Sequence, residues 1–513
     1  MALFLLVTHG SDGDVLPFVG LGAALVRAGH RAVLLTHAPY RAAATAAGLG
    51  FEPIDDEAEF ERVLADTPHL LHAAPHRAGW ARFYRDNGLF EQIAAECRTL
   101  IRLHSPGETV LVGRHTSAVS VRFAAELLDA PAAWVALSPT QLLAVPVAAY
   151  LYGTELATGL HAVRTDLGLP PIPNWRTWFT TADAELALWP AWFDAAATPA
   201  PPRTTLTGFP LADSSAPALG ATPPPAAPGG TGDGDMGTQP TDAPQRAEAS
   251  PAAPAPAAVG DLASGDRRSA AAEGVFGGAF GADVRPVLAT GGTGRMLAAD
   301  YYPALLAAVE RAGLPTVLVV RHRDLLPAVL PANVRWSPGL DFARAVPRAA
   351  AVVHHGGIGT LARVLAAGTP QVLMADGVDR PDNAARLTAL GLARTVPADR
   401  WYGPELAAAI TAAANDHGYR ARAAAVAGDP VSGLDLAATR LAALLTRPTT
   451  SIATPAPIHD RLRNLPPTAR ADLRERLRHR LAPTPPESTP PGPGRTGRGA
   501  TPARPDRAPE EAR

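Results

Sequence analysis

Two long stretches of small, proline-rich sequence limit how this 513-residue chain can fold. Many of its 53 prolines lie in residues 214–272 and 448–513, which contain few large apolar residues. Such segments cannot bury enough apolar surface to offset the entropy lost on ordering, so we expect a disordered linker and a disordered C-terminal tail. The remaining sequence forms two blocks of ordinary domain size, residues 1–213 and 273–447.

Composition and charge exclude several classes of protein. A formal net charge of −2 provides no basic field for binding nucleic acid. The single cysteine, Cys97, excludes an intramolecular disulfide framework and a cysteine-cluster metal site. Residues 2–7 are apolar but short and lack a basic segment before them, which favours a buried strand over a signal peptide. No apolar run reaches the ~18 residues of a membrane span. We expect a cytoplasmic protein without a transmembrane segment, for which peripheral membrane contact stays open.

Both blocks alternate short apolar runs with stretches of helical periodicity. The predicted strands are Leu3–Val7, Ala32–Thr36, Thr109–Val112, Ala132–Ala136, Val287–Thr290, Thr316–Val320, Ala350–His354 and Val372–Ala375. The predicted helices include Leu16–Ala28, Ala299–Arg311, Thr360–Ala367 and Pro381–Ala389. This alternation predicts an α/β fold with two Rossmann-like parallel-sheet domains facing a cleft. Ligands of such sheets bind at the carboxyl ends of the strands.

A glycine-rich turn in the second block is the best candidate for a phosphate site. The sequence HHGGIGT, residues 354–360, joins a predicted strand to a predicted helix. A helix N-terminus offers free N–H groups and the positive end of the helix dipole, which together favour an anion. Thr360 could cap the helix, and His355 could donate an imidazole N–H. A plain tight turn is the alternative. A metal site is less favoured, because neighbouring strand residues point to opposite faces.

A second strand–glycine–helix turn, residues 7–17, lies near the N-terminus. It lacks GxGxxG, and no acidic residue ends the following strand, which argues against a dehydrogenase. Asp14 would lie at the helix start, either as a charge that favours the helix dipole or as a general base toward a hydroxyl. His9 is a weaker catalytic candidate. Residues 376–383 (DGVDRPDN) could bind sugar hydroxyls or form a solvated loop.

Several stretches resemble the large family of inverting GT-B glycosyltransferases that includes macrolide, glycopeptide, sterol and rhamnolipid glycosyltransferases. Residues 8–30 (THGSDGDVLPFVGLGAALVRAGH) are similar to that family's GSxGDxxPxxxLGxxLxxxGH opening. LGLPPIPNW (167–175) and LTGFPL (206–211) are similar to its rhamnosyltransferase-like branch. Residues 347–391, from PRAAAVVHHGGIGT to RLTALG, resemble its nucleotide-sugar signature and are the most specific feature.

The resemblance implies roles for individual residues. Asp14 matches the base that deprotonates the acceptor hydroxyl, with Ser11 as a second candidate beside it. The donor-binding positions match Gly292, Thr293, Trp336, Pro338, His355, Gly357, Gly359, Thr360, Asp379 and Arg380. The family usually has Gln where this chain has Arg380, and Arg brings a fixed charge and no acceptor. A deoxysugar donor, an acidic sugar donor and an Arg380 directed elsewhere are therefore all open.

The implied reaction moves a hexose or deoxyhexose from a UDP- or dTDP-sugar to a hydroxyl of a hydrophobic small molecule or lipid. It inverts the anomeric carbon and needs no metal or other cofactor. Six aromatic residues could line the acceptor site, or could be ordinary core residues: Trp80, Phe83, Tyr84, Trp175, Trp178 and Phe179. Two alternatives are a nucleotide-sugar-binding homologue without transfer activity and a GT-B sugar-nucleotide epimerase. The GSDGD and GFPL stretches argue against the epimerase.

Overall fold

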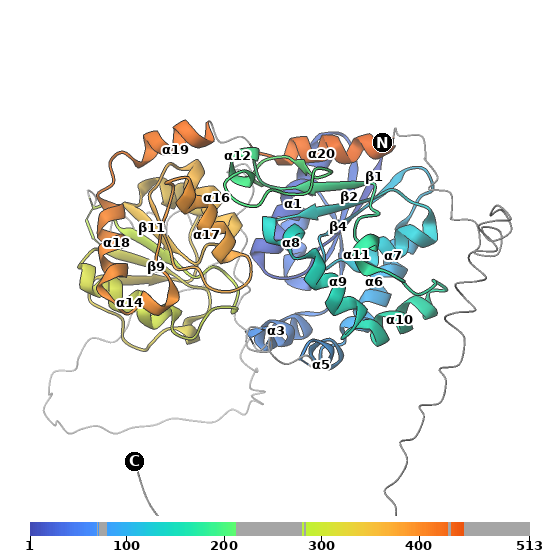
Figure 1. The fold of residues 1–513 in the computed structure, drawn as a ribbon, viewed down its shortest axis with the longest axis horizontal. Coiled ribbons are helices and arrows are strands. Elements are labelled where there is room, and N and C mark those ends of the chain that lie inside the picture. The colour runs from blue at the N-terminus through green and yellow to red at the C-terminus, as the bar shows by residue number, and fades with distance from the viewer. Residues whose placement is uncertain (69, 71–78, 212–279, 282–283, 429–431, 446–513) are drawn as a thin grey trace, which may run out of the picture. The chain divides into compact units, whose positions relative to one another are not determined.

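A computed structural model describes residues 1–68, 70, 79–211, 280–281, 284–428 and 432–445. Its sheets and helices form two α/β halves, each built around one fully parallel sheet (Figure 1). The predicted linker, 214–272, and the predicted tail, 448–513, lie outside the described residues.

The N-terminal half contains a seven-stranded parallel sheet in the order β3-β2-β1-β4-β5-β6-β7. Its strands are β1 (Leu3–Val7), β2 (Arg31–Thr36), β3 (Gly50–Pro53), β4 (Thr109–Arg114), β5 (Ala132–Ala136), β6 (Ala184–Ala187) and β7 (Thr205–Leu206). Its helices are α1 (Asp12–Arg27), α2 (Arg41–Ala46), α3 (Glu57–Asp66), α5 (Gly79–Asp86), α6 (Leu89–Leu103), α7 (Val119–Leu128), α8 (Pro139–Leu143), α9 (Val145–Gly153), α10 (Ala157–Asp166), α11 (Trp175–Trp178) and α12 (Ala191–Asp194). Every residue of β1 and β5 is buried, as expected for strands that are covered on both faces.

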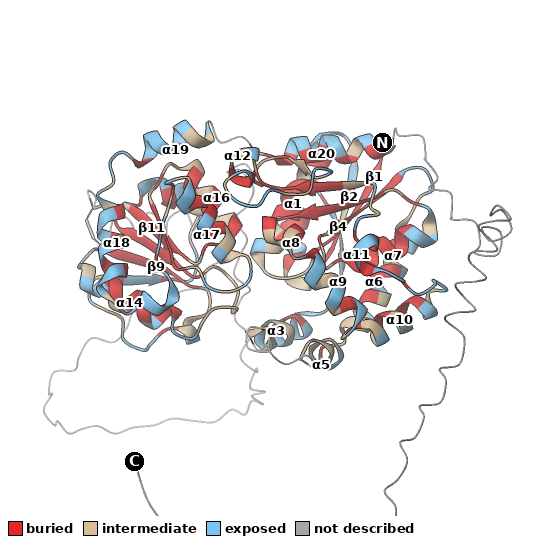
Figure 2. Cartoon of the chain, in the orientation of Figure 1, coloured by how far each residue is buried: buried red, intermediate tan, exposed pale blue. Residues whose placement is uncertain are grey.

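The C-terminal half contains a six-stranded parallel sheet in the order β10-β9-β8-β11-β12-β13. Its strands are β8 (Val287–Thr290), β9 (Thr316–Val319), β10 (Val334–Ser337), β11 (Ala351–His354), β12 (Gln371–Leu373) and β13 (Arg394–Thr395). Its helices are α14 (Tyr301–Ala312), α15 (Phe342–Ala345), α16 (Ile358–Ala366), α17 (Arg380–Ala389), α18 (Pro404–Ala414) and α19 (Tyr419–Ala427). Figure 2 shows buried strands in both sheets and exposed outer faces on the surrounding helices.

The last described helix, α20 (Leu434–Ala442), returns to the N-terminal half. It lies against α1 (Figure 1), and Leu434 and Leu441 are buried in the core cluster that contains β1 and α1. The predicted block 273–447 therefore ends in a helix whose apolar face completes the N-terminal core. The apolar side of α20 packs against α1 and not against the C-terminal sheet.

The predicted strands are confirmed, and their ends differ from the observed ones by at most two residues. The first helix begins earlier than predicted, at Asp12 instead of Leu16, because Ser11 is its N-cap and Pro17 is accommodated inside it. Five short strands were not predicted: β3, β6, β7, β10 and β13. They have two to four residues and mixed polar and apolar sequences such as VRWS, so they lack a continuous apolar run.

Each sheet has a point where the strand order reverses. In the N-terminal sheet the point lies between β1 and β4, and in the C-terminal sheet between β8 and β11. Loops leaving the carboxyl ends of such neighbouring strands diverge and leave room for a ligand. Both glycine-rich turns identified in the sequence follow one of these strands.

Candidate active site

The loop after β1 holds Asp14 in a fixed position. Ser11 is the N-cap of α1, and its backbone N–H donates to Asp14 Oδ2 at 3.1 Å. Arg114, at the end of β4, places Nη2 2.8 Å from Asp14 Oδ1. The Asp14 side chain is 28% exposed, so an external hydroxyl could reach it. The two predicted catalytic residues, Asp14 and Ser11, thus lie together at the switch point of the sheet.

Arg114 is a site residue that the sequence did not reveal. Besides its ion pair with Asp14, its Nη1 donates to the backbone oxygen of His9 at 3.0 Å and to Ser117 Oγ at 3.3 Å. The predicted strand ended at Val112, two residues before Arg114, whereas the observed β4 extends to Arg114. Nothing in the sequence pairs residues a hundred positions apart.

Contacts between the two halves bring the loop after β1 close to the C-terminal half, which contains the donor-binding candidates. Arg321, which follows β9, forms a two-point ion pair with Asp12, with its shorter contact at 2.8 Å. Tyr40 donates its hydroxyl to the same carboxylate at 2.8 Å. Ser11 Oγ lies 3.6 Å from where a Cβ on Gly294 would be. Ser11 therefore lies beside the loop that contains Gly292, Thr293 and Gly294.

His354 and His355 have different environments. His354 is fully buried; its Nε2 lies 3.0 Å from Gln371 Oε1, and its Nδ1 accepts the N–H of Gly356 at 3.1 Å. Burial lowers the pKa of His354 to about 4, against the opposing effect of the Gln371 hydrogen bond. His354 is thus neutral at pH 7 and holds the turn in shape.

His355 projects between the two glycine loops. A Cβ on Gly357 would lie 2.4 Å from His355 Nε2, and a Cβ on Gly292 2.7 Å from Cε1. Burial, followed by the charges of Arg380 and His354, lowers its pKa well below the ordinary value. His355 Nδ1 is buried and has no hydrogen-bond partner among the described residues. A neutral imidazole carries one N–H, which can donate to a ligand oxygen.

The turn itself has the geometry of an anion site. Gly356 has φ +90°, a conformation that favours glycine, and Gly357 is the N-cap of α16. Thr360 was expected to be able to cap this helix, but it is the third helical residue and donates its N–H to the carbonyl of Gly357 at 3.1 Å. Gly359 belongs to the same first turn. The turn therefore directs the α16 N-terminus toward the His355 ring.

Asp379 and Arg380 lie at the start of α17 and have different environments. Burial raises the pKa of Asp379, and the negative charge of Asp14 adds to the rise. The charge of Arg380 and a 3.0 Å hydrogen bond from Asn383 act to lower this pKa but do not outweigh the burial. Arg380 donates from Nη1 to the Asp376 carbonyl at 3.0 Å and from Nη2 to the Met296 carbonyl. Its guanidinium therefore joins the loop after β8 to the loop after β12. Of the possibilities that the sequence left open, the structure favours an Arg380 directed to the protein backbone.

Trp336 and Pro338 lie at the end of the edge strand β10. Trp336 is 36% exposed, its Nε1 donates to the Val320 carbonyl at 2.9 Å, and the Arg323 guanidinium lies 5.8 Å from the ring centre. Pro338 is also exposed. A fixed, partly exposed indole offers a flat surface on which a nucleotide base could stack.

The six aromatic candidates divide into two groups. Trp175, Trp178 and Phe179 are buried with Trp134 and Tyr152 in the N-terminal core. These three are core residues, and Trp175 also lines a cavity of about 370 Å³ together with Tyr150 and His161. Trp80, Phe83 and Tyr84 are half-buried and remain candidates for an acceptor wall.

A cavity of about 460 Å³ lies away from these residues. Its lining includes Trp192, Phe209, Leu365, Ala423 and Arg420, and none of the predicted site residues. Among the described residues, no group of three or more His, Cys, Asp or Glu side chains could hold a metal ion. No described helix is long and apolar enough to cross a bilayer. Independence from metals stays a prediction.

Solved structures share this two-domain architecture over nearly their whole length. The glycotransferase of kitacinnamycin has a TM-score of 0.58 at 19% identity, covering 86% of this chain and 99% of that chain. VinC in complex with dTDP has a TM-score of 0.58 at 16% identity, covering 87% and 100%. SnogD from Streptomyces nogalater has a TM-score of 0.56 at 20% identity, covering 86% and 100%. The chain therefore has the GT-B fold that was predicted.

Sequence comparison defines the C-terminal half more closely. Residues 306–434 match the family described as erythromycin biosynthesis protein CIII-like, C-terminal domain. The chain is 44% identical over 95 residues to O-mycaminosyltylonolide 6-deoxyallosyltransferase of Streptomyces fradiae, covering 18% of this chain and 22% of that protein. It is 39% identical over 95 residues to aklavinone 7-beta-L-rhodosaminyltransferase of Streptomyces galilaeus, covering 18% and 21%. The chain thus matches about a fifth of the length of these two relatives.

Proposed function

We propose that the protein is an inverting glycosyltransferase. It transfers a hexose or deoxyhexose from a dTDP- or UDP-sugar to a hydroxyl of a hydrophobic natural product. The observation that carries the proposal is the close approach of Ser11 Oγ to Gly294, which brings the loop after β1 beside the loop after β8, each at the switch point of its sheet. A proton acceptor on one half and an anion site on the other are what transfer from a nucleotide sugar requires.

The donor diphosphate is proposed to bind at the α16 N-terminus. Gly357, Gly359 and Thr360 supply the close backbone approach and the dipole, and His355 donates its one N–H to a phosphate oxygen. A neutral His355 is compatible with this role, because it needs a donor N–H and not a charge. Trp336 and Pro338 would contact the base, and Asp379 the sugar hydroxyls. The names of two solved neighbours, VinC and SsfS6, mention bound thymidine diphosphate, which favours dTDP.

The reaction is a single displacement. Asp14 accepts the proton of the acceptor hydroxyl while that oxygen bonds to the anomeric carbon. The bond from this carbon to the diphosphate breaks, and negative charge grows on the leaving oxygens. His355 and the α16 N-terminus stabilise that charge. Arg380 would hold the loops beside the sugar in place, because its terminal nitrogens donate to the backbone carbonyls of Asp376 and Met296.

Hydrophobic acceptors are favoured by two observations. Half-buried Trp80, Phe83 and Tyr84 belong to the N-terminal half, on or beside α5. The names of two relatives give O-mycaminosyltylonolide and aklavinone as the molecules that they glycosylate. We therefore propose a polyketide alcohol as the first acceptor class to test, with sterols as the second.

The test is a transfer assay with a matched pair of variants. Wild-type protein, Asp14→Asn and the control Asp435→Asn are incubated with dTDP- and UDP-sugars and a set of polyketide and sterol alcohols, and products are identified by mass spectrometry. Asp435, on α20, pairs with the exposed Arg27 at the C-terminal end of α1. Asp14 lies at the opposite end of α1, in its first turn. We expect Asp14→Asn to lower turnover by roughly 10²–10⁴-fold while it still binds dTDP, and the control to match wild type.

Three results would contradict the proposal in different ways. Nucleotide-sugar binding without turnover by the wild type would indicate a non-catalytic homologue. A changed sugar nucleotide formed without any acceptor would indicate an epimerase. Full activity in Asp14→Asn would exclude Asp14 as the base.

A further inference from the structure

A guanidinium on α16 lies beside the glycine-rich turn. Arg363 is one helical turn after Gly359, and its Nη1 donates to the Gly359 carbonyl at 3.3 Å. Side chains on a helix lean toward its N-terminus, so this charge is directed back toward the first turn of α16. Leaving aside the helix backbone and the two chain neighbours, a Cβ on Gly359 would meet one atom of the described residues within 4 Å, Arg363 Nη1 at 3.7 Å. The face of α16 between the turn and the guanidinium is therefore open.

The first turn of α16 offers unused backbone donors next to this face. The N–H groups of Thr360 and Leu361 both donate to the Gly357 carbonyl. Those of Ile358 and Gly359 come earlier in the helix, and within the described part of the chain they donate to no acceptor. Two free N–H groups and the Arg363 guanidinium thus lie within one helical turn of one another.

The Arg363 guanidinium has few partners for a half-buried charge. In the described part of the chain its side chain makes one hydrogen bond, the long contact with Gly359, and no ion pair. Burial lowers the pKa of Arg363, and the charges of Asp12 and Asp341 oppose this without outweighing it. Asp341 is engaged elsewhere, because its Oδ1 accepts two backbone N–H groups at the start of α15.

Asp12 is engaged elsewhere as well. Its two oxygens accept hydrogen bonds from Arg321, and Tyr40 donates its hydroxyl to Oδ1. Asp12 is the first residue of α1, and α1 lies against α16. The carboxylate is therefore close enough to influence Arg363 electrostatically but is paired with other groups.

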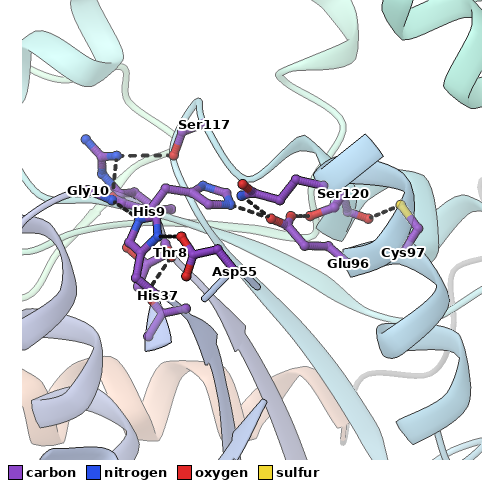
Figure 3. A network of polar contacts seen from close by, with 12 residues as sticks. Thr8, His9, Gly10, His37, Asp55, Glu96, Cys97, Ser117 and Ser120 are labelled. Carbon is purple, nitrogen blue, oxygen red and sulfur yellow. Dashed lines mark hydrogen bonds and ion pairs between the residues drawn. The ribbon is translucent and has the colours of Figure 1, made fainter. Parts of the chain in front are cut away.

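Two histidine–carboxylate pairs fix the loop that carries this carboxylate, the loop after β1 (Figure 3). His9 Nε2 lies 2.8 Å from Glu96 Oε1, and His37 Nδ1 lies 2.5 Å from Asp55 Oδ2. His37 Nε2 also accepts the backbone N–H of Gly10 at 2.9 Å. A loop held in this way keeps its aspartate with the partners that it already has.

The other groups of the donor site supply little positive charge to a diphosphate. Burial keeps His355 neutral by lowering its pKa. The charge of Arg380 acts on the neighbouring Asp379 carboxylate, whose pKa it acts to lower, and its guanidinium donates to two backbone carbonyls. The end of a helix dipole supplies only about half an elementary charge. A diphosphate carries several negative charges, so a further cation at this turn would bind it more tightly.

We propose that Arg363 binds the diphosphate of the nucleotide sugar and supplies this charge. The inference rests on the proposed function. The guanidinium donates to phosphate oxygens through N–H groups that the protein leaves free, next to the N–H groups of Ile358 and Gly359. When the bond from the anomeric carbon to the diphosphate breaks, its electron pair moves to the leaving oxygen, and the fixed charge of Arg363 stabilises the product. Arg363 thus favours nucleoside diphosphates over the uncharged nucleoside.

The test compares the binding of dTDP and of thymidine. Calorimetry measures dTDP at low and high salt, and ligand-observed NMR measures thymidine, for wild type, Arg363→Met, Arg363→Gln, Arg363→Lys and Arg420→Met. Arg420 is the matched control. Its guanidinium also donates to a carbonyl of the same helix at 3.3 Å, but at Ala367, the C-cap of α16, where it is exposed.

We expect Arg363→Met and Arg363→Gln to weaken dTDP binding by roughly ten- to a hundredfold and to make it less sensitive to salt. Thymidine affinity should stay the same, Arg363→Lys should lie between wild type and Arg363→Gln, and Arg420→Met should match wild type.

Three results would overturn the inference and leave the proposed function intact. One is a dTDP affinity in the neutral variants equal to that of wild type. Another is an equal loss of dTDP and thymidine binding with unchanged salt dependence, which indicates a merely structural role. If Arg363→Met does not fold, the third is an equal dTDP affinity in Arg363→Gln and Arg363→Lys. Folded wild-type protein that binds no nucleoside diphosphate overturns the proposed function instead.

Discussion

The imidazole ring of His355 occupies the space in which a side chain at Gly292 would begin. A Cβ on Gly292 would lie 2.7 Å from His355 Cε1, closer than such atoms approach in proteins, and Gly292 has φ +85°. Gly292→Ala should therefore displace His355 and weaken dTDP binding at least tenfold, or about 1.4 kcal/mol. Isothermal titration calorimetry with dTDP measures the change.

Gly13→Ala is the matched control for this substitution. Gly13 lies in α1, and a Cβ there meets no atom within 4 Å. Alanine should leave dTDP affinity unchanged and stabilise the helix by up to about 1 kcal/mol. Equal dTDP affinities for wild type and Gly292→Ala would show that His355 does not hold the diphosphate.

Arg380 connects the loops on both sides of the donor site. Its two terminal nitrogens donate to the carbonyls of Asp376 and Met296, which lie in different loops. Arg380→Gln is too short to make both contacts, so it should loosen the loop after β8 and weaken dTDP binding by roughly tenfold. Arg420→Gln is the control, because the 3.3 Å contact of Arg420 with the Ala367 carbonyl is exposed and lies away from the donor loops. An unchanged dTDP affinity in Arg380→Gln would show that dTDP binding does not depend on Arg380 connecting the two loops.

Much of the fold could be predicted from local patterns. The buried strands Leu3–Val7 and Val287–Thr290 are continuous apolar runs bounded by glycine-rich turns, and each has the predicted bounds. His355 and Gly357 could be identified because strand, glycine turn and helix follow one another directly in sequence. Their local order is sufficient to place them at the carboxyl end of a strand.

The rest of the site depends on contacts between distant residues. Arg114 meets Asp14 only because β4 pairs with β1, and Arg321 meets Asp12 only because the two halves touch. The return of α20 to the N-terminal core likewise depends on which half offers an uncovered apolar surface. Such pairings are set by topology, and a single sequence carries no local signal for them.

Arg386 joins the two halves through a buried guanidinium. It is fully buried on α17, donates to Asp382, and also donates to the carbonyls of Phe193, Asp194 and Thr198 in the other half. Arg386→Met would leave these acceptors unpaired and should destabilise the protein by about 3–5 kcal/mol. Thermal and urea unfolding measure the loss.

Arg422→Met provides the comparison for this prediction. Arg422 pairs with Asp416 at the surface, where such a pair contributes about 0–1 kcal/mol. Its melting temperature should stay close to that of wild type. Similar small losses for both variants would mean that Arg386 does not hold the halves together.

The folded protein should lose stability at acid pH, because His354 in the glycine-rich turn is harder to protonate in the folded chain than in the unfolded chain. Its pKa is about 4 in the folded chain, against an ordinary value of 6.5. The unfolded chain therefore binds the proton first, so the stability from this group is complete above about pH 6.5 and is lost as the pH falls toward 4. The total loss is about 3 kcal/mol. His355 shifts in the same direction and adds to the effect.

Melting temperatures of wild type and His354→Asn between pH 7 and pH 4 test this expectation. Asn can still accept the Gly356 N–H but does not titrate, so its melting temperature should fall less steeply with acid. His417→Asn, at an exposed position, should follow the wild type. Parallel curves for all three proteins would contradict the assignment.

Binding of dTDP to the wild-type protein tests the central claim most directly. A calorimetric titration should show one saturable site per chain, and His355→Gln should weaken it by tenfold or more. Folded wild-type protein that takes up neither dTDP nor UDP, nor any of their sugars, would contradict the account.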